Sequence, residues 1–270
     1  MSAPGSRCRW GILVGALMVL GAIPAGATSD ADQIVASINS VSQGEQVSRR
    51  LTMEMTDRRG KTRKRETTNF RKYYGEEMRT VLFYLSPANV RDTGFLIWDY
   101  PDYDKEDDQW LYLPAMRKVR RISASDRGDY FLGTDLTFED MKLDGKLEPR
   151  DWTFSLGNGG AQDADGMLVL EAVPRDKGIA KELGYSRSRY FVDPSNYMVM
   201  TAEFWDLKDK PLKTLTIHDV RQVDGIWTRH RLEVRNHKTG HQTVMTFSDV
   251  DYQSPVKDSM FTRRALERGI

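Results

Sequence analysis

The residues best suited to chemistry gather between positions 95 and 140, and the first of them form an acidic loop. Residues 99–108 read DYPDYDKEDD and carry six carboxylates. Calcium is a hard cation that binds several carboxylate oxygens, but an EF-hand loop also needs a glycine at its sixth position and a distal glutamate, and this loop has neither. We therefore predict a solvated loop that joins two strands, with a contact for a basic partner as the alternative.

A basic strand follows the acidic loop and is the second candidate site. Residues 117–122 read RKVRRI, and alternation along a strand would place Arg117 and Arg121 on one face and Arg120 on the other. A half-buried strand normally keeps charge off one of its faces, so one face here could line the mouth of a cavity. Guanidinium groups there would bind a phosphate or carboxylate head group through paired hydrogen bonds. The alternative is that these arginines form salt bridges with the preceding acidic loop.

A second basic group lies at a predicted hairpin tip, where residues 58–65 read RRGKTRKR and carry six positive charges. Basic side chains near an anionic bilayer each contribute up to about 1 kcal/mol to binding. The tip could therefore make a transient membrane contact or dock on an acidic partner. The alternative is a tip that is simply solvated.

The histidines and serines offer weaker candidates. If residues 224–225 form a two-residue turn, His230 lies opposite Asp219 and His218 lies opposite Arg231. No third ligand is evident beside the histidines, so surface cross-strand pairs are favoured over a metal site. The serines at positions 86, 123, 125, 186 and 188 lack the G-x-S-x-G setting of a hydrolase. We therefore assign no catalytic residue, no metal and no cofactor.

The N-terminal residues indicate an exported protein. Two arginines precede an apolar run over residues 10–23 and a cleavage site of small residues at 24–27, which is the pattern of a secretory signal peptide. The run is shorter than the about 20 residues that a membrane span needs, and an uncleaved anchor is the alternative. Cleavage after Ala27 would also remove the chain's one cysteine. We predict a periplasmic protein with a signal peptide at 1–27 and a single domain at 28–270.

The overall charge argues against one class of partner. The chain has 40 basic and 39 acidic residues, and loss of the signal peptide with its two arginines would leave 38 and 39. A nucleic-acid-binding domain usually carries a clear excess of positive charge. We therefore predict no nucleic-acid partner, and any electrostatic attraction must come from local patches.

The elements that would position these groups are mostly strands. Residues 30–42 show the apolar spacing of an amphipathic helix, and residues 256–268 show a second one. Between them about eleven strand-like runs alternate with turn-forming residues, with a short helical segment at 88–93. The strands predicted in the second half span 152–156, 167–173, 185–192, 198–207, 212–222, 226–236 and 243–250.

This pattern predicts a mainly β protein built on a curled antiparallel sheet with a few helices covering its concave face. An antiparallel meander of that size must curl or close. An apolar cavity between sheet and helices could remain partly unfilled and receive a ligand. The aromatic residues Trp98, Trp110 and Tyr112 are core residues by default, and the alternative is that they line such a cavity.

Three consecutive motifs within residues 85–140 resemble a known family. They read LSPANVRDTGFLIWDY, DDQWLYLPAMRKVRRI and SASDRGDYFLGTDLTFED. Together with the signal peptide and the N-terminal helix, they resemble the outer-membrane lipoprotein-sorting-like proteins, which are periplasmic relatives of the lipoprotein carrier LolA and its receptor LolB. The resemblance runs from residue 30 to the end and implies a half-open, LolA-like β-barrel with helices as a lid over an apolar cavity.

The resemblance also implies a carrier that performs no chemistry. Such a protein would bind the acyl chains of a lipoprotein or another lipid and shuttle them between membranes, with an RND-type exporter as a partner. In LolA an arginine on an early strand helps to hold the lid, and Arg49 or Arg50 lies in a comparable region. The alternatives are an accessory subunit of a membrane transporter with a filled core, and a lipid hydrolase. The residues predicted to bind the ligand are Trp98, Trp110, Tyr112, Arg117, Arg120 and Arg121.

Overall fold

Strands are the main regular elements of the structure. The computed structural model describes Met1 and residues 30–270, apart from residues 103 and 158–161. The strands in this part of the chain are β1 (Gln46–Thr56), β2 (Thr62–Tyr74), β3 (Glu77–Ser86), β4 (Gly94–Asp99), β5 (Asp108–Leu113), β6 (Lys118–Arg121), β7 (Trp152–Leu156), β8 (Leu168–Pro174), β9 (Arg187–Val192), β10 (Val199–Trp205), β11 (Pro211–Ile217), β12 (Val220–Val223), β13 (Ile226–Arg229), β14 (Arg231–Asn236) and β15 (Gln242–Asp251).

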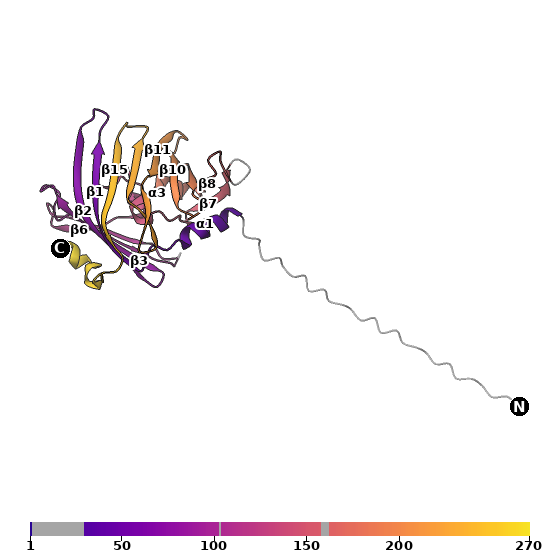
Figure 1. Cartoon of the computed structure of the whole chain (residues 1–270), viewed down its shortest axis with the longest axis horizontal. Helices are drawn as coiled ribbons and strands as arrows, with labels where there is room; N and C mark the ends of the chain where they lie inside the picture. The colour runs from indigo at the N-terminus through magenta and orange to yellow at the C-terminus, as the bar shows by residue number, and fades with distance from the viewer. Residues whose placement is uncertain (2–29, 103, 158–161) are drawn as a thin grey trace.

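The order of the strands explains why the barrel stays half open. Thirteen of the described strands form one antiparallel sheet in the order β6-β5-β4-β3-β2-β1-β15-β14-β11-β10-β9-β8-β7, and β12 pairs with β13 separately. In this described sheet β6 and β7 lie at opposite edges and are not paired with each other. So large a sheet must curl because neighbouring strands twist relative to one another. Figure 1 shows the strands fanned across the molecule, and the predicted curled, half-open barrel is confirmed.

The helices are short and cover both faces of the sheet. In the described residues they are α1 (Asp30–Ser40), α2 (Phe138–Leu143), α3 (Lys177–Leu183) and α4 (Arg263–Arg268), with 3-10 turns η1 (Ala124–Asp126), η2 (Phe131–Gly133) and η4 (Asp258–Met260). The segment with η2 and α2 packs on the inner face, α1 packs against β7, and α4 packs on the outer face of β4 and β5. Figure 1 shows α1 and the C-terminal helix at opposite ends of the molecule. Within the described part of the chain, none of these helices has the length and apolar character that crossing a bilayer requires.

Alternation along β4 separates the two faces. Phe95 and Ile97 point to the inner face, where the Phe95 ring lies 4.9 Å from the ring of Phe131. Leu96 points to the outer face and packs in the same cluster as Leu266 of α4. Successive side chains of a strand point to opposite sides of a sheet. Both faces of β4 are apolar, so both must be covered. The segment with η2 and α2 covers the inner face, and α4 covers the outer face.

The short helix α2 forms because its sequence supplies both of its ends. Thr137 Oγ1 accepts a hydrogen bond from the Asp140 backbone N–H at 3.1 Å, and the Asp140 carboxylate accepts one from the Thr137 backbone N–H at 2.7 Å. This reciprocal pair is a capping box, which satisfies two N–H groups that the first turn leaves free. At the other end Asp144 has a φ of 47° and Gly145 a φ of 97°. The left-handed backbone ends the helix there, and the Asp144 carboxylate contacts the sheet.

Several predicted elements are confirmed. The N-terminal helix is present as α1, and residues 224–225 form the turn between β12 and β13. The His218 backbone N–H donates to the Arg231 carbonyl at 2.9 Å, and the His230 N–H donates to the Asp219 carbonyl at 2.7 Å. Both pairs agree with the register that a two-residue turn imposes.

Other predicted elements are wrong. Residues 88–93 form turns rather than a helical segment: two backbone N–H groups converge on the Pro87 carbonyl, and the positive φ of Asp92 stops any further helical turn. The predicted strands 212–222 and 226–236 each break, so that β12 and β13 form a hairpin of their own.

The remaining differences concern helices. The sequence pattern does not predict α2 or α3, because one or two turns are too short to show an apolar repeat. The C-terminal helix is shorter than the predicted 256–268 and is preceded by the 3-10 turn η4. The predicted signal peptide at 1–27 (Met1 apart) and most of the predicted turn at 157–160 lie outside the described residues. The division into a signal peptide and a single domain stays a prediction.

Candidate functional site

An apolar cavity lies between the inner face of the sheet and the segment that contains α2. We call it the main cavity, and it encloses about 1130 Å³ of empty space, including the part that is open to solvent. Aliphatic and aromatic side chains from both halves of the sheet make up most of the lining, among them Leu82, Ile97, Leu215, Ile217, Met245 and Phe247.

Part of the lining of the main cavity is polar because Arg49, Asp144 and Arg229 contribute to it, and Arg71 joins them through Asp144. Asp144, at the end of α2, lies 2.8 Å from Arg49 Nη2 and 2.9 Å from Arg71 Nη1, and it also forms an ion pair with Arg229. We call these four residues the Asp144 cluster. The Nε of Arg49 also donates to Asn69 Oδ1 at 2.8 Å. Because the arginines come from β1, β2 and β13, a single carboxylate fastens α2 to three separate strands.

Burial and charge act in opposite directions on Asp144. Burial would raise the pKa of Asp144, but the charges of Arg49, Arg229 and Arg71 outweigh it and hold the pKa well below its usual value. The side chains of the three arginines are 9%, 11% and 3% exposed, in the same order. Removing one partner of a buried ion pair is strongly destabilising because the other charge is left uncompensated. The Asp144 cluster is therefore a strong attachment as long as the carboxylate is ionised.

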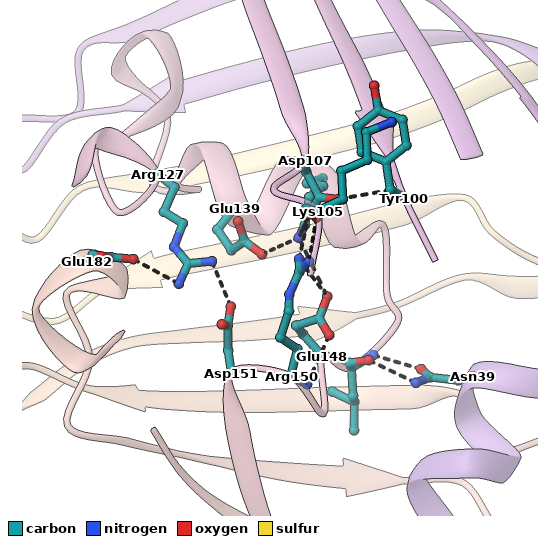
Figure 2. Close-up of polar contacts among 12 residues, drawn as sticks. Asn39, Tyr100, Lys105, Asp107, Arg127, Glu139, Glu148, Arg150, Asp151 and Glu182 are labelled. Carbon is teal, nitrogen blue, oxygen red and sulfur yellow. Dashed lines mark hydrogen bonds and ion pairs between the residues drawn. The ribbon is translucent and has the colours of Figure 1, made fainter. Parts of the chain in front are cut away.

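A second set of ion pairs holds α2 to the acidic loop. Lys142 of α2 is buried and its Nζ lies 2.7 Å from Asp107, 2.8 Å from Glu139 and 3.6 Å from Glu148. Arg150 also contacts Asp107 at 2.7 Å, and Figure 2 shows it beside Glu148. Burial alone would lower the pKa of Lys142, but the carboxylates of Glu139 and Asp107 outweigh it and raise the pKa above its ordinary value. Lys142 therefore stays charged.

A second concave site, which we call the charged pocket, adjoins this network. It lies between the acidic loop and β5 on one side and residues 150–151 and α3 on the other, and it encloses about 800 Å³, including the part that is open to solvent. Arg127 spans it, with contacts of 2.7 Å to Asp151 and 3.1 Å to Glu182 of α3 (Figure 2). Glu139 lines both the main cavity and the charged pocket, so the two sites are adjacent.

A third ion pair fastens the other end of α2. Lys213 of β11 is fully buried, forms an ion pair with Asp140 and donates to the Asp135 carbonyl at 3.0 Å. The rings of Tyr185 and Phe204 lie 5.2 and 5.1 Å from its ammonium group, within range of a cation–π interaction. The Lys213–Asp140 pair, the ion pairs of Lys142 and those of Asp144 together tie α2 to the rest of the structure along its whole length.

The aromatic residues predicted to bind the ligand lie away from the main cavity. Trp98 and Trp110 pack edge to face on the outer side of the sheet with ring centroids 5.2 Å apart, and Trp98 donates to the Phe261 carbonyl at 3.1 Å. Tyr112 packs against the same cluster. Leu111, between Trp110 and Tyr112, takes the inward position. None of these three aromatic residues, all in the described chain, lines the main cavity, so ligand binding by them stays a prediction that would need a ligand on the outer face.

The three arginines predicted to bind a head group are all exposed. Arg121 forms an ion pair with Asp108 of the acidic loop at 2.8 Å and lines the charged pocket. Arg120 pairs with Asp126 at 2.9 Å, and Arg117 precedes β6 with a φ of 50°. The salt bridge to the acidic loop, the alternative for this strand, is therefore present for Arg121. A contact between these arginines and a head group stays a prediction.

Histidine and serine side chains contact other polar groups, but the predicted surface position is wrong for His230, which is buried. His241 Nδ1 lies 2.6 Å from an Asp135 carboxylate oxygen, and His237 Nε2 lies 2.8 Å from Thr214 Oγ1. Ser188 is buried and donates to the hydroxyl of a neighbouring tyrosine. Among the described residues, no three His, Cys, Asp or Glu side chains are grouped so that they could hold a metal ion.

Sequence reasoning misses most of the residues that define the two sites. The segment 137–140 reads TFED, a threonine followed three residues later by an aspartate, which resembles the capping pattern of a helix and could have predicted α2 with Asp144 at its end. A second available signal is the polar inward face of β2, where the buried residues are Thr67, Asn69 and Arg71. Buried polar residues at every second position of a strand indicate a polar partner on that face.

The fold and the main cavity together define a class of protein: an open antiparallel sheet with a helix-covered apolar interior, which is the LolA-like fold. A family model described as "Uncharacterized protein"-like matches residues 76–268, so the chain belongs to that family. No curated protein matches the chain.

Solved structures agree with this assignment. A DUF1329 family protein from Desulfovibrio piger is 28% identical, with a TM-score of 0.77 over 87% of this chain and 96% of the other. A domain described as an outer membrane lipoprotein-sorting protein from Vibrio parahaemolyticus is 26% identical, with a TM-score of 0.78 over 88% and 98%. A LolA superfamily protein from Nitrosomonas europaea is 19% identical, with a TM-score of 0.64 over 87% and 98%, and shows the shared fold.

Proposed function

We propose that this protein is a periplasmic, non-enzymatic carrier that binds the acyl chains of a lipoprotein or another lipid in the main cavity and shuttles them between membranes. The observation that carries the proposal is the main cavity itself, which is apolar, enclosed by a curled sheet and covered by α2. Each CH₂ group that moves from water into such a cavity contributes about 0.8 kcal/mol. The lipoprotein-sorting name of one structural neighbour supports the same cargo class.

The attachment of α2 supports a cover that holds the cargo in place. We propose that Arg49 rather than Arg50 has the role of the lid-holding arginine, and the support is that Arg49 is buried against Asp144 at 2.8 Å. The neighbouring Arg50 is exposed and pairs with Asp249 on the surface. Since cargo must enter and leave, we propose that α2 moves away from the sheet during loading and that the Asp144 cluster sets the cost of that movement.

The proposal is tested by purifying the protein from a bacterial periplasm and extracting it for lipid mass spectrometry. We expect bound lipid in the extract and saturable uptake of a fluorescent fatty acid. The variant Ala202→Phe places a ring in the main cavity, which Ala202 lines, and should weaken uptake by about tenfold or more because about 1.4 kcal/mol of lost apolar contact is already tenfold. The matched control Thr201→Phe, one position along β10, points to the opposite face and should leave uptake unchanged.

Two other results would point to the alternative functions. Absence of bound lipid together with no uptake would refute the carrier, and capture of a membrane transporter by the same lipid-free protein would favour an accessory subunit. Turnover of ester substrates that disappears when a single serine is replaced would favour a hydrolase.

The proposed partners are an RND-type exporter and, transiently, a membrane surface. The support for the membrane contact is the tip between β1 and β2, where Arg58, Arg59 and Lys61 are exposed. Sedimentation with vesicles that contain anionic lipid should retain the protein at low salt, and replacement of these three residues by serine should abolish retention. Crosslinking in the periplasm followed by mass spectrometry would identify an exporter.

A further inference from the structure

The charged pocket contains a buried hydrogen-bond acceptor that no group in the described part of the chain satisfies. Gln109 is 5% exposed and its Oε1 has no hydrogen-bond partner there. Glu139, which also lines the pocket, is 4% exposed, and its Oε1 forms an ion pair with the Lys142 ammonium at 2.8 Å. An unpaired buried acceptor costs about 1–3 kcal/mol, and most such groups in proteins are paired. The Gln109 acceptor therefore points to a donor supplied by a ligand.

The charge of the pocket indicates that this donor is a cation. Six acidic and three basic side chains line the pocket. Two of the basic ones are already paired within it, Arg127 with Asp151 and Arg150 with Asp107. A positively charged donor would gain from this excess of carboxylates, whereas a neutral or anionic donor would not.

The position of the pocket indicates what carries the cation. Gln109 lies on β5 beside Trp110, and because successive side chains alternate, it faces inward while the tryptophan faces out. Glu139 of α2 lines the charged pocket on one side and the main cavity on the other. A group bound at Gln109 and Glu139 is therefore next to the end of any chain that fills the main cavity.

Resting on the proposed function, we propose that the charged pocket binds the primary ammonium group of a lipid head group whose acyl chain occupies the main cavity. Gln109 Oε1 and the Glu139 carboxylate accept hydrogen bonds from the ammonium group. The free Nε–H of Arg127, which also has no partner among the described residues, donates to an oxygen of the same head group. An ethanolamine-type head group, with an ammonium beside an oxygen, offers all three partners.

The test compares three single-chain lipids that differ only in the head group, at concentrations below micelle formation. Lysophosphatidylethanolamine has a primary ammonium, lysophosphatidylcholine has a cation without N–H donors, and lysophosphatidylglycerol has no cation. We expect the first to bind about tenfold more tightly than the other two, as one or two charge-assisted hydrogen bonds would give. Gln109→Leu and Glu139→Gln should each reduce this preference, while the control Glu54→Gln, on an exposed position of β1, should keep it.

The outcomes separate this inference from the proposed function. Equal binding of the three lipids would overturn the ammonium site and leave the acyl-chain carrier standing. Binding of none of them would overturn the carrier. In that case an NMR titration with free ethanolamine tests whether the charged pocket binds an ammonium group by itself. A shift of the Gln109 side-chain amide signal that is lost in Glu139→Gln would support the site, and the absence of a shift would overturn it.

Discussion

Replacing Asp144 by asparagine tests whether one carboxylate holds α2 over the main cavity. Asparagine has nearly the size of aspartate and can still accept hydrogen bonds, but it carries no charge. Arg49, Arg71 and Arg229 remain protonated, because a guanidinium group does not lose its proton in proteins. The variant therefore leaves three positive charges close together with at most 11% of any of the three side chains exposed.

The expected loss of stability is large for a single substitution. Removing one partner from a buried ion pair costs about 3–5 kcal/mol. The three pairs share one carboxylate, so their contributions are not additive, and we expect a total loss of about 4 kcal/mol. For a chain of this size that corresponds to a fall in Tm of roughly 8–16 °C.

The control is the ion pair of Arg50, the residue that follows Arg49 in the sequence. Arg50 pairs with Asp249 at 3.1 Å, but these side chains are 60% and 70% exposed. Such a surface pair contributes about 0–1 kcal/mol, so Asp249→Asn should change the free energy of unfolding by less than about 1 kcal/mol. Urea unfolding followed by tryptophan fluorescence measures both variants.

The pH dependence supplies an independent check. The folded-state pKa of Asp144 lies well below its ordinary value, so its contribution to stability is complete above about pH 4 and is lost as the pH falls towards the folded-state pKa. The difference in the free energy of unfolding between the wild type and Asp144→Asn should therefore become smaller below pH 4. The reasoning would be refuted if Asp144→Asn lost no more stability than Asp249→Asn. It would also be refuted if the difference in stability between wild type and Asp144→Asn stayed constant in acid.

Three further predictions concern other parts of the structure. Burial raises the pKa of Asp99 to about 7, so the protein should lose stability as the pH rises from about 4 to that value, and Asp99→Asn should stabilise it in urea at pH 8 but not at pH 4. Lys213→Met leaves Asp140 buried without its cation and should cost about 3–5 kcal/mol; adding Asp140→Asn should recover part of the loss in a double-mutant cycle. In Gly128→Ala the new Cβ would lie 2.3 Å from the Glu182 carbonyl oxygen, so we expect a loss of about 1–3 kcal/mol in thermal unfolding, and an unchanged Tm would show that this contact is not tight.

The fold could be predicted from the sequence because the sheet alternates and its turns have strong signals. The strand predicted at 152–156 and the observed β7 have the same limits, and the turn at 224–225 fixed the register of two histidines. Where the prediction is wrong, local signals were weak. The helices α2 and α3 have six and seven residues, and their stability comes from caps and from contacts with distant residues, which an apolar repeat does not report.

The candidate sites were harder to predict because long-range folding assembles them. The Asp144 cluster takes its members from β1, β2, β13 and the end of α2, and no single stretch of sequence contains more than one of them. The basic run at 117–122 is conspicuous in the sequence because its charges are nearly consecutive, yet Arg120 and Arg121 are exposed and paired on the surface. Similarly, the aromatic character of Trp98, Trp110 and Tyr112 does not indicate which face of the sheet they occupy. They lie on the outer face, while their neighbours Ile97 and Leu111 face inward.

The described sheet, which stays open to hold a cavity, also keeps two edge strands, β6 and β7, that do not pair with each other. The backbone N–H and C=O groups along the outer side of β6 could pair with the same edge of a second molecule and begin a growing stack. Lys118, Arg120 and Arg121 are exposed along that edge, and two such strands brought together would place positive charges against each other. The positive charges of this strand therefore oppose edge-to-edge pairing of two molecules through β6.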